Sequence, residues 1–136
     1  MIRVFSVCAS ICLVGLSGCN EGFEKEVAPV TGTVTCAGSP VTEGYVIFTP
    51  VVSAESNPMN SGKAATGTIN SDGTYTLTTY DEGDGAMIGT HEVRIYKPDP
   101  EDDEQIVVDP FVCGDRVLKV TVDDKSNVID LDPAKG

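Results

Sequence analysis

The stretch KAATGTINSDGTYTLTTY, residues 63–80, contains two predicted strands around a tight turn. Asp72-Gly73, inside the turn Asn70–Gly73, is a strong hairpin signal because both residues tolerate the left-handed backbone of a short turn. After the turn, threonines alternate with Tyr75 and Leu77, which is the period of two expected of a strand with one buried face. The stretch therefore predicts a β-hairpin in which residues 63–69 pair with residues 74–80.

Other short segments on both sides of this hairpin are also typical of strands. They are Val30–Cys36, Gly44–Thr49, Gly89–Lys97, Val117–Val122 and Val128–Leu131. Turns rich in Gly, Pro, Asn and Asp separate them, and no long window shows the apolar period of a helix. The segment 44–49 is apolar on both faces and is expected in the centre of a sheet, and the last two segments are expected to form a closing hairpin. The prediction is an all-β sandwich of about seven strands.

An ordered series of short motifs built from Gly, Pro and apolar residues extends over residues 29–96. These positions are Val30-x-Gly32-x-Val34, Gly38 with Pro40, Val46-x-Phe48-x-Pro50, Gly67-x-Ile69-x-x-Asp72-Gly73-x-Tyr75-x-Leu77 and Gly89-x-His91-x-Val93-x-Ile95. In this order and spacing they resemble a carboxypeptidase-regulatory-like domain. The resemblance implies a single prealbumin-like (transthyretin-like) Greek-key β-sandwich of about seven strands, with no reaction shared by the family. Two residues depart from the family pattern: Cys36 replaces an aliphatic or polar residue, and His91 replaces the usual Tyr.

The N-terminus is positively charged and is followed by an uncharged apolar run over residues 4–16. As a helix this run would span about 20 Å, which is too short for a hydrocarbon core of about 30 Å, so it is typical of a signal peptide. Leu16-Ser17-Gly18-Cys19 then resembles the bacterial lipobox. The resemblance implies that the Cys19 thiol carries a diacylglycerol, that a peptidase cuts just before it, and that the acyl chains hold the protein on the membrane. The alternative is a plain secretory signal peptide.

Cleavage at this point would divide the chain into three segments. Residues 1–18 are the expected lipoprotein signal peptide, residues 19–29 a polar tether, and residues 30–136 the β-sandwich. The expected location is the bacterial cell envelope, on the outer membrane or on the periplasmic face of the inner membrane. Asn20 is not the Asp that often marks retention at the inner membrane, so it favours transport outward.

The five cysteines have different expected fates. Cys8 and Cys12 fall in the signal peptide, and Cys19 is committed to lipid. Cys36 and Cys113 remain, and in an oxidising compartment they either form a disulfide or stay as two unrelated thiols.

The acidic balance of the chain excludes one class of partner. The formal net charge is −12 at pH 7, whereas nucleic acid binding needs a basic face. We therefore expect no nucleic acid partner. The charge suits a solvated exported protein or one that meets cations.

The sequence offers no recognisable catalytic site. A zinc peptidase would need a cluster of ligands, but the chain has a single histidine, His91. Because it is in phase with Val93 and Ile95, it is expected in the core or at its rim rather than as a ligand or base. There is no Gly-x-Ser-x-Gly motif, and residues 132–136 differ from the Tyr-Arg-Gly-Ser end of the transthyretin-like enzymes. We expect no enzymatic activity and no cofactor.

Asp81, Glu82 and Asp84 are weak candidates for a calcium site, because carboxylate oxygens are the ligands that calcium prefers. They lack the EF-hand spacing, and so does the acidic loop over residues 98–104, so solvated loops are the favoured interpretation. The expected function is that of a lipid-anchored, non-catalytic envelope module, binding or structural, whose partner is an unknown envelope protein or glycan. The alternative is a transthyretin-like enzyme or a small-ligand or calcium-binding domain, which a polar pocket around His91 would favour.

Overall fold

The computed structural model describes residues 25–52, 62–99 and 109–135. The predicted signal peptide, the lipobox residues Leu16, Ser17 and Gly18, and Cys19 lie outside the described residues, as does most of the predicted tether. Within the described ranges the chain is all-β, which confirms the predicted fold class. The strands are β1 (Val27–Ala28), β2 (Val30–Thr33), β3 (Thr35–Cys36), β4 (Ser39–Pro40), β5 (Tyr45–Pro50), β6 (Ala65–Thr68), β7 (Thr74–Thr76), β8 (Ala86–Met87), β9 (Gly89–Tyr96), β10 (Leu118–Val122) and β11 (Asn127–Val128). Several are only two residues long, so the described strands outnumber the roughly seven predicted.

The larger sheet has the strand order β10-β9-β5-β6, and all its pairs are antiparallel. Strand β5 lies inside it, as the apolar character of both its faces predicted. Val46 and Phe48 are fully buried on the core side, while Tyr45 and Ile47 are half-buried on the outer side. The outer face of this sheet therefore carries aromatic and apolar side chains that the core does not use.

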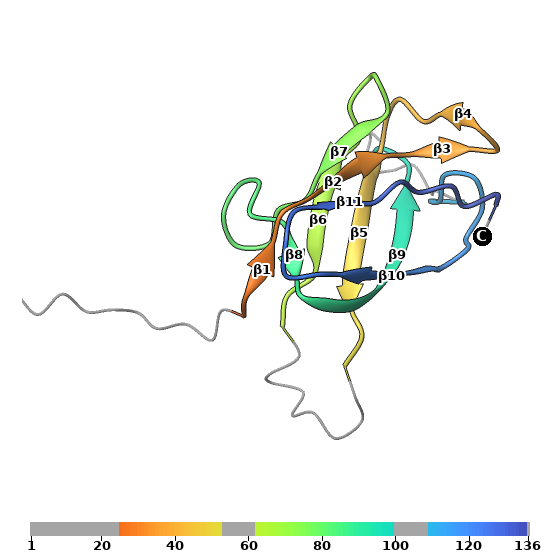
Figure 1. Cartoon of the computed structure of the whole chain (residues 1–136). Coiled ribbons are helices and arrows are strands. Elements are labelled where there is room, and N and C mark those ends of the chain that lie inside the picture. The colour runs from red at the N-terminus through yellow and green to blue at the C-terminus, as the bar shows by residue number, and fades with distance from the viewer. Residues whose placement is uncertain (1–24, 53–61, 100–108, 136) are drawn as a thin grey trace, which may run out of the picture.

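The second sheet has the order β11-β2-β7, with β11 parallel to β2. In Figure 1, β2 and β11 cross in front of β6 and β5 of the larger sheet. Apolar side chains from both sheets meet in one core, which includes Val30, Val34, Val46, Phe48, Tyr75, Leu77, Val93, Ile95, Val122 and Leu131. The fold is thus a sandwich of two sheets, each burying one face.

The β6–β7 hairpin links the two sheets. Its turn is the one predicted, because Gly73 N–H donates to the Asn70 carbonyl at 2.9 Å. At the far end, Thr66 and Thr78 exchange two backbone hydrogen bonds of 3.0 and 2.8 Å. Between these points β7 leaves β6 and pairs with β2, which is why β7 is shorter than the predicted strand 74–80.

The predicted closing hairpin is wrong. Strand β10 pairs with β9 in the larger sheet, whereas β11 pairs with β2 in the other. Asn127 makes the crossover, because its buried side-chain amide donates to the carbonyls of Pro29, Asp123 and Lys125 at 3.3, 3.1 and 2.7 Å. A period of two identifies a strand but does not specify its partner, and the loop of residues 123–127 changes sheets instead of reversing within one.

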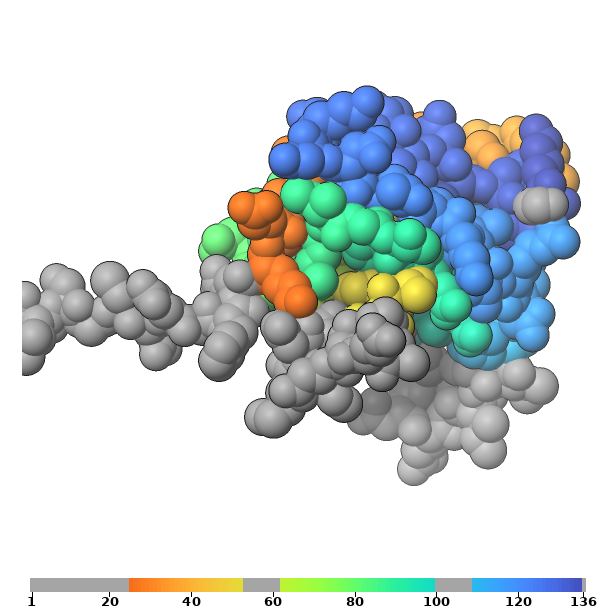
Figure 2. Space-filling model, turned by 60° about the horizontal axis from the view of Figure 1, so that its bottom comes forward, coloured from red at the N-terminus to blue at the C-terminus, as the bar shows by residue number. Residues whose placement is uncertain are grey.

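The ordered fold begins before the predicted boundary at residue 30. Val27 and Ala28, assigned to the tether by the sequence, pair with Met87 and Ala86 as β1 and β8. Figure 2 shows the orange segment that holds β1 lying against the green part of the chain. Ala28 is buried in the core, so these tether residues belong to the sandwich.

Candidate ligand-binding groove

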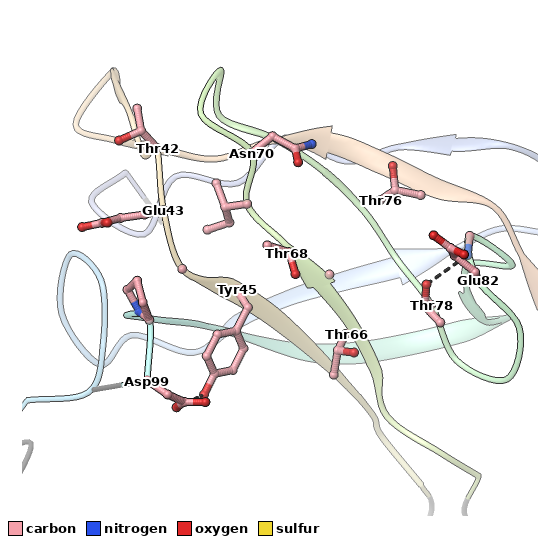
Figure 3. Close-up of a pocket in the computed structure, with 15 residues that line it drawn as sticks. Thr42, Glu43, Tyr45, Thr66, Thr68, Asn70, Thr76, Thr78, Glu82 and Asp99 are labelled. Carbon is pink, nitrogen blue, oxygen red and sulfur yellow. Dashed lines mark hydrogen bonds between the residues drawn. The ribbon is translucent and has the colours of Figure 1, made fainter. Parts of the chain in front are cut away.

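An open groove of about 1070 Å³ lies on the surface beside β6 (Figure 3). Five separate parts of the chain line it: Thr42–Tyr45, Thr66–Asn70, Thr76 with Thr78, Glu82–Gly83, and Pro98–Asp99. Threonine is the commonest lining residue, and none of the described lining residues is Lys or Arg. The groove is therefore rich in hydroxyls and acidic in charge.

Alternation along β6 places small polar side chains in the groove. Ala65 and Gly67 face the core, and Thr66 and Thr68 are exposed on the opposite side. Gly67 is needed because a Cβ there would lie 2.7 Å from the carbonyl oxygen of Thr76, closer than atoms pack. The short outward side chains of Thr66 and Thr68 leave open space above this part of the sheet.

A row of side chains crosses the outer face from the groove. Tyr45 is paired with Thr68 on one side and with Tyr96 on the other. The rings of Tyr45 and Tyr96 stack with centroids 5.3 Å apart and planes 11° apart. Phe111 continues the row, 5.1 Å from Tyr96, and the Arg94 guanidinium lies 5.6 Å from the Phe111 ring. Because Tyr96 covers one face of Tyr45, the other ring face is turned toward β6 and the groove.

Strand β6 also presents backbone hydrogen-bonding groups to the groove. Ile69 N–H donates to the Gly44 carbonyl at 2.9 Å, so the odd-numbered residues of β6 bond to β5 and the even-numbered ones point the other way. Thr66 is satisfied there by Thr78. Thr68 makes no such bond within the described residues, although the Thr76 carbonyl of β7 lies close to β6 at Gly67. The N–H and C=O of Thr68 are therefore unpaired on the side of β6 that faces away from β5.

Three exposed carboxylates surround the groove: Glu43, Glu82 and Asp99. The Tyr45 hydroxyl donates to Asp99 at 3.4 Å, which holds the ring edge. Partial burial, together with the Asp99 charge, raises the pKa of the Tyr45 phenol. The ring is therefore neutral at physiological pH, and the groove repels anions.

The acidic turn after β7 is used mainly for local structure. Both carboxylate oxygens of Asp84 accept backbone N–H bonds, from Thr79 at 2.7 Å and from Tyr80 and Asp81 at 2.9 Å. Burial pushes the pKa of Asp84 upward, but these hydrogen bonds outweigh it and lower the pKa. Of the calcium candidates, only Glu82 lines the groove. No group of three or more His, Cys, Asp or Glu side chains suited to a metal ion occurs among the described residues.

His91 is buried in the core, as its phase with Val93 and Ile95 predicted. Its ring packs 5.9 Å from the Phe48 ring, and Nδ1 is 3.1 Å from the Gly89 carbonyl. Burial lowers the pKa of the imidazole, so it is neutral near pH 7. It does not line the groove, and it is not placed as a ligand or a base.

The structure joins Cys36 to Cys113 in a disulfide whose Cα atoms are 5.9 Å apart. The bond ties β3, which follows β2 in the chain and pairs with β4, to the segment that leads into β10. It lies outside the set of groove-lining residues.

Sequence reasoning missed Tyr45, Thr68 and Thr76 as site residues. The sequence feature that could have indicated them is alternation: they occupy the outward-facing positions of their strands, where charged residues are common but Thr and Tyr occur instead. The phase shows which side chains face outward, but not that five distant segments meet.

Compared with models of known protein families, with curated proteins and with solved structures, the chain matches none of them. The described part of the chain also has no helix long and apolar enough to cross a membrane. The groove is therefore interpreted from its own geometry and chemistry.

Proposed function

We propose that the protein is a lipid-anchored, non-catalytic binding module of the bacterial cell envelope, and that its ligand occupies the groove beside β6. The groove itself carries this proposal, because it combines a tyrosine ring, threonine hydroxyls and open backbone groups on a rigid sheet. Acyl chains on Cys19 would hold the sandwich at the outer membrane or at the periplasmic face of the inner membrane.

The chemistry of the groove supports binding over catalysis. The only histidine of the chain is buried in the core, away from the lining residues. Tyr75, the other buried titratable side chain described, donates its hydroxyl to the Ile129 carbonyl, and burial raises its pKa. Neither side chain is placed to transfer a proton to a ligand in the groove.

We also propose that the sandwich is a carboxypeptidase-regulatory-like domain. The proposal is supported by the order of the glycine and apolar motifs and by their places in the fold. For example, Gly32 of β2 is the partner of Tyr75 of β7, and a Cβ there would lie 1.9 Å from the Ile129 carbonyl oxygen and 3.0 Å from the Tyr75 ring. The alternative function, a transthyretin-like enzyme, would need a polar pocket around His91, and the described surroundings of His91 are core residues.

The anchor is tested by the intact mass of the membrane-extracted protein. The expected chain begins at Cys19 and carries two or three acyl chains. A Cys19→Ser variant should lack them and leave the membrane fraction. A wild-type mass that retains Met1, or cleavage elsewhere without lipid, would overturn the anchor.

The groove is tested with an unlipidated chain from residue 20 onward and isolated envelopes of the source bacterium. The wild-type chain should co-sediment with the envelopes. Thr68→Lys should abolish retention, because it places a long side chain in the groove. Thr121→Lys makes the same change at an exposed position of β10, at the opposite edge of the same sheet, and should leave retention intact. Equal retention of both variants would refute the groove as the site.

A further inference from the structure

We infer that the groove takes a neutral oligosaccharide built of pyranose rings, an inference that rests on the proposed function of the groove as the ligand site. The inference is based on the position of the Tyr45 ring, which has one face open, next to threonine hydroxyls and the unpaired Thr68 backbone (Figure 3).

The ring of Tyr45 provides the apolar part of such a site. Its stacking on Tyr96 fixes its orientation, and its hydroxyl bond to Asp99 fixes its edge. The face turned toward β6 stands beside Thr68 and Thr66, whose short side chains leave room above the sheet. The C–H face of a pyranose ring matches this arrangement, because it is apolar and of similar size to the phenol ring.

The floor of the groove provides the polar part. Sugar hydroxyls both donate and accept hydrogen bonds, so they need partners of both kinds. Threonine hydroxyls from β6 and β7 do both, and the open Thr68 backbone adds one donor and one acceptor. The carboxylates of Glu82 and Asp99 accept only, which suits the hydroxyl protons of a sugar.

The negative charge of the groove favours neutral glycans over anionic ones, and the side chains of the groove disfavour apolar peptides. Three carboxylates and no Lys or Arg occur among the described lining residues, so an anionic glycan would be repelled. Among the lining residues that the structure describes, an apolar peptide finds only one large aliphatic side chain, Ile69, and it is buried. A basic peptide is compatible with the charge but does not use the hydroxyl floor.

The test uses the lipidated full chain in a detergent without a sugar headgroup. Cellohexaose, mannohexaose and the hexamer of N-acetylglucosamine serve as neutral probes, and hexalysine serves as the basic peptide. Binding is measured by titration calorimetry and located by amide chemical shifts. At least one neutral probe should bind and shift amides of residues 66–69 and 76–78.

The variants separate the two parts of the site. Tyr45→Leu should weaken binding by about tenfold, and Tyr45→Phe should restore most of it, because the ring face is kept. Thr68→Val should weaken binding about threefold through loss of one hydroxyl. Thr121→Val is the same change away from the groove and should have no effect. Equal affinities for Thr68→Val, Thr121→Val and Tyr45→Leu would overturn the inference.

The outcomes distinguish the inference from the proposed function. If only hexalysine binds and shifts the groove amides, the oligosaccharide is overturned and the groove remains a binding site. If no neutral probe binds while Thr68→Lys still abolishes envelope retention, the ligand class is again wrong and the function stands. If neither probe class reaches the groove and envelope retention ignores Thr68→Lys, both fail.

Discussion

His91 is a titratable side chain whose buried position disfavours the charged form of the imidazole. Its exposed fraction is 1%, and its Nε2 atom has no hydrogen-bond partner among the described residues. Burial therefore lowers the pKa of His91 below its ordinary value of 6.5. The unfolded chain takes up a proton at a higher pH than the folded chain, so the free energy of unfolding falls as pH drops below about 6.5.

Replacing His91 by Leu should remove this pH dependence. The variant loses the bond to the Gly89 carbonyl but also removes the unpaired buried Nε2, so its free energy of unfolding at pH 8 should lie within about 1 kcal/mol of the wild-type value. Between about pH 7 and pH 5, however, the wild-type value should fall more steeply than that of the variant. Urea unfolding at both pH values measures the difference. Parallel pH profiles would show that His91 is not buried as a neutral group.

Tyr75 is a second residue whose polar group, the phenol hydroxyl, forms a hydrogen bond inside the fold. Its side chain lies beside Gly32 of β2, and its hydroxyl donates at 2.5 Å to the Ile129 carbonyl, beyond that strand. Tyr75→Phe keeps the ring in the core and removes only this bond. The expected loss is about 1 kcal/mol in the free energy of unfolding, measured by urea titration. Tyr80→Phe, whose hydroxyl accepts a bond from the Lys25 N–H at the start of the described chain, should cost less.

At the scale of elements, the sequence predicted strands better than partners. The strand over residues 89–96 was evident because His91, Val93 and Ile95 alternate with polar residues, and β9 follows that pattern. The destination of β11 was not evident, because it depends on hydrogen bonds of Asn127 to a carbonyl far away in sequence. The groove was hidden for the same reason, since its walls come from segments that only the paired sheets bring together.

The crossover between β10 and β11 should therefore depend on Asn127. Its side chain makes three donor contacts and accepts the Asp123 N–H at 3.0 Å. Asn127→Ala removes these four partly buried bonds, although the Asn127 N–H still pairs with the Pro29 carbonyl, so we expect a loss of about 2 kcal/mol in the free energy of unfolding. Hydrogen exchange should rise first along β11 and residues 129–131. Asn70→Ala is the control, because it removes one exposed bond to Thr74, and an equal effect of both changes would contradict this role.

At the scale of the whole molecule, the two faces of the larger sheet have different roles. The inner face packs against the second sheet and fixes the strands. The outer face carries the aromatic row and the hydroxyls of the groove, which contribute little to the core. Changes to Thr68 or Thr76 should therefore alter binding with little effect on stability, whereas changes to the crossover or the disulfide should do the reverse.

The disulfide between Cys36 and Cys113 is the whole-molecule constraint that tests this separation. It joins residues 77 positions apart, and closing a loop of that size stabilises a fold by about 4 kcal/mol on the chain-entropy model. The double variant Cys36→Ala/Cys113→Ala should lose roughly this amount in the free energy of unfolding. Below its unfolding transition it should keep wild-type affinity for whatever ligand the groove binds, because neither cysteine lines the groove. Wild-type protein treated with reductant is the matched control and should unfold at the same urea concentration as the variant. Alkylation of both thiols in folded, unreduced wild type would show that the bond is absent, and loss of binding by a folded variant would show that the disulfide and the groove are coupled.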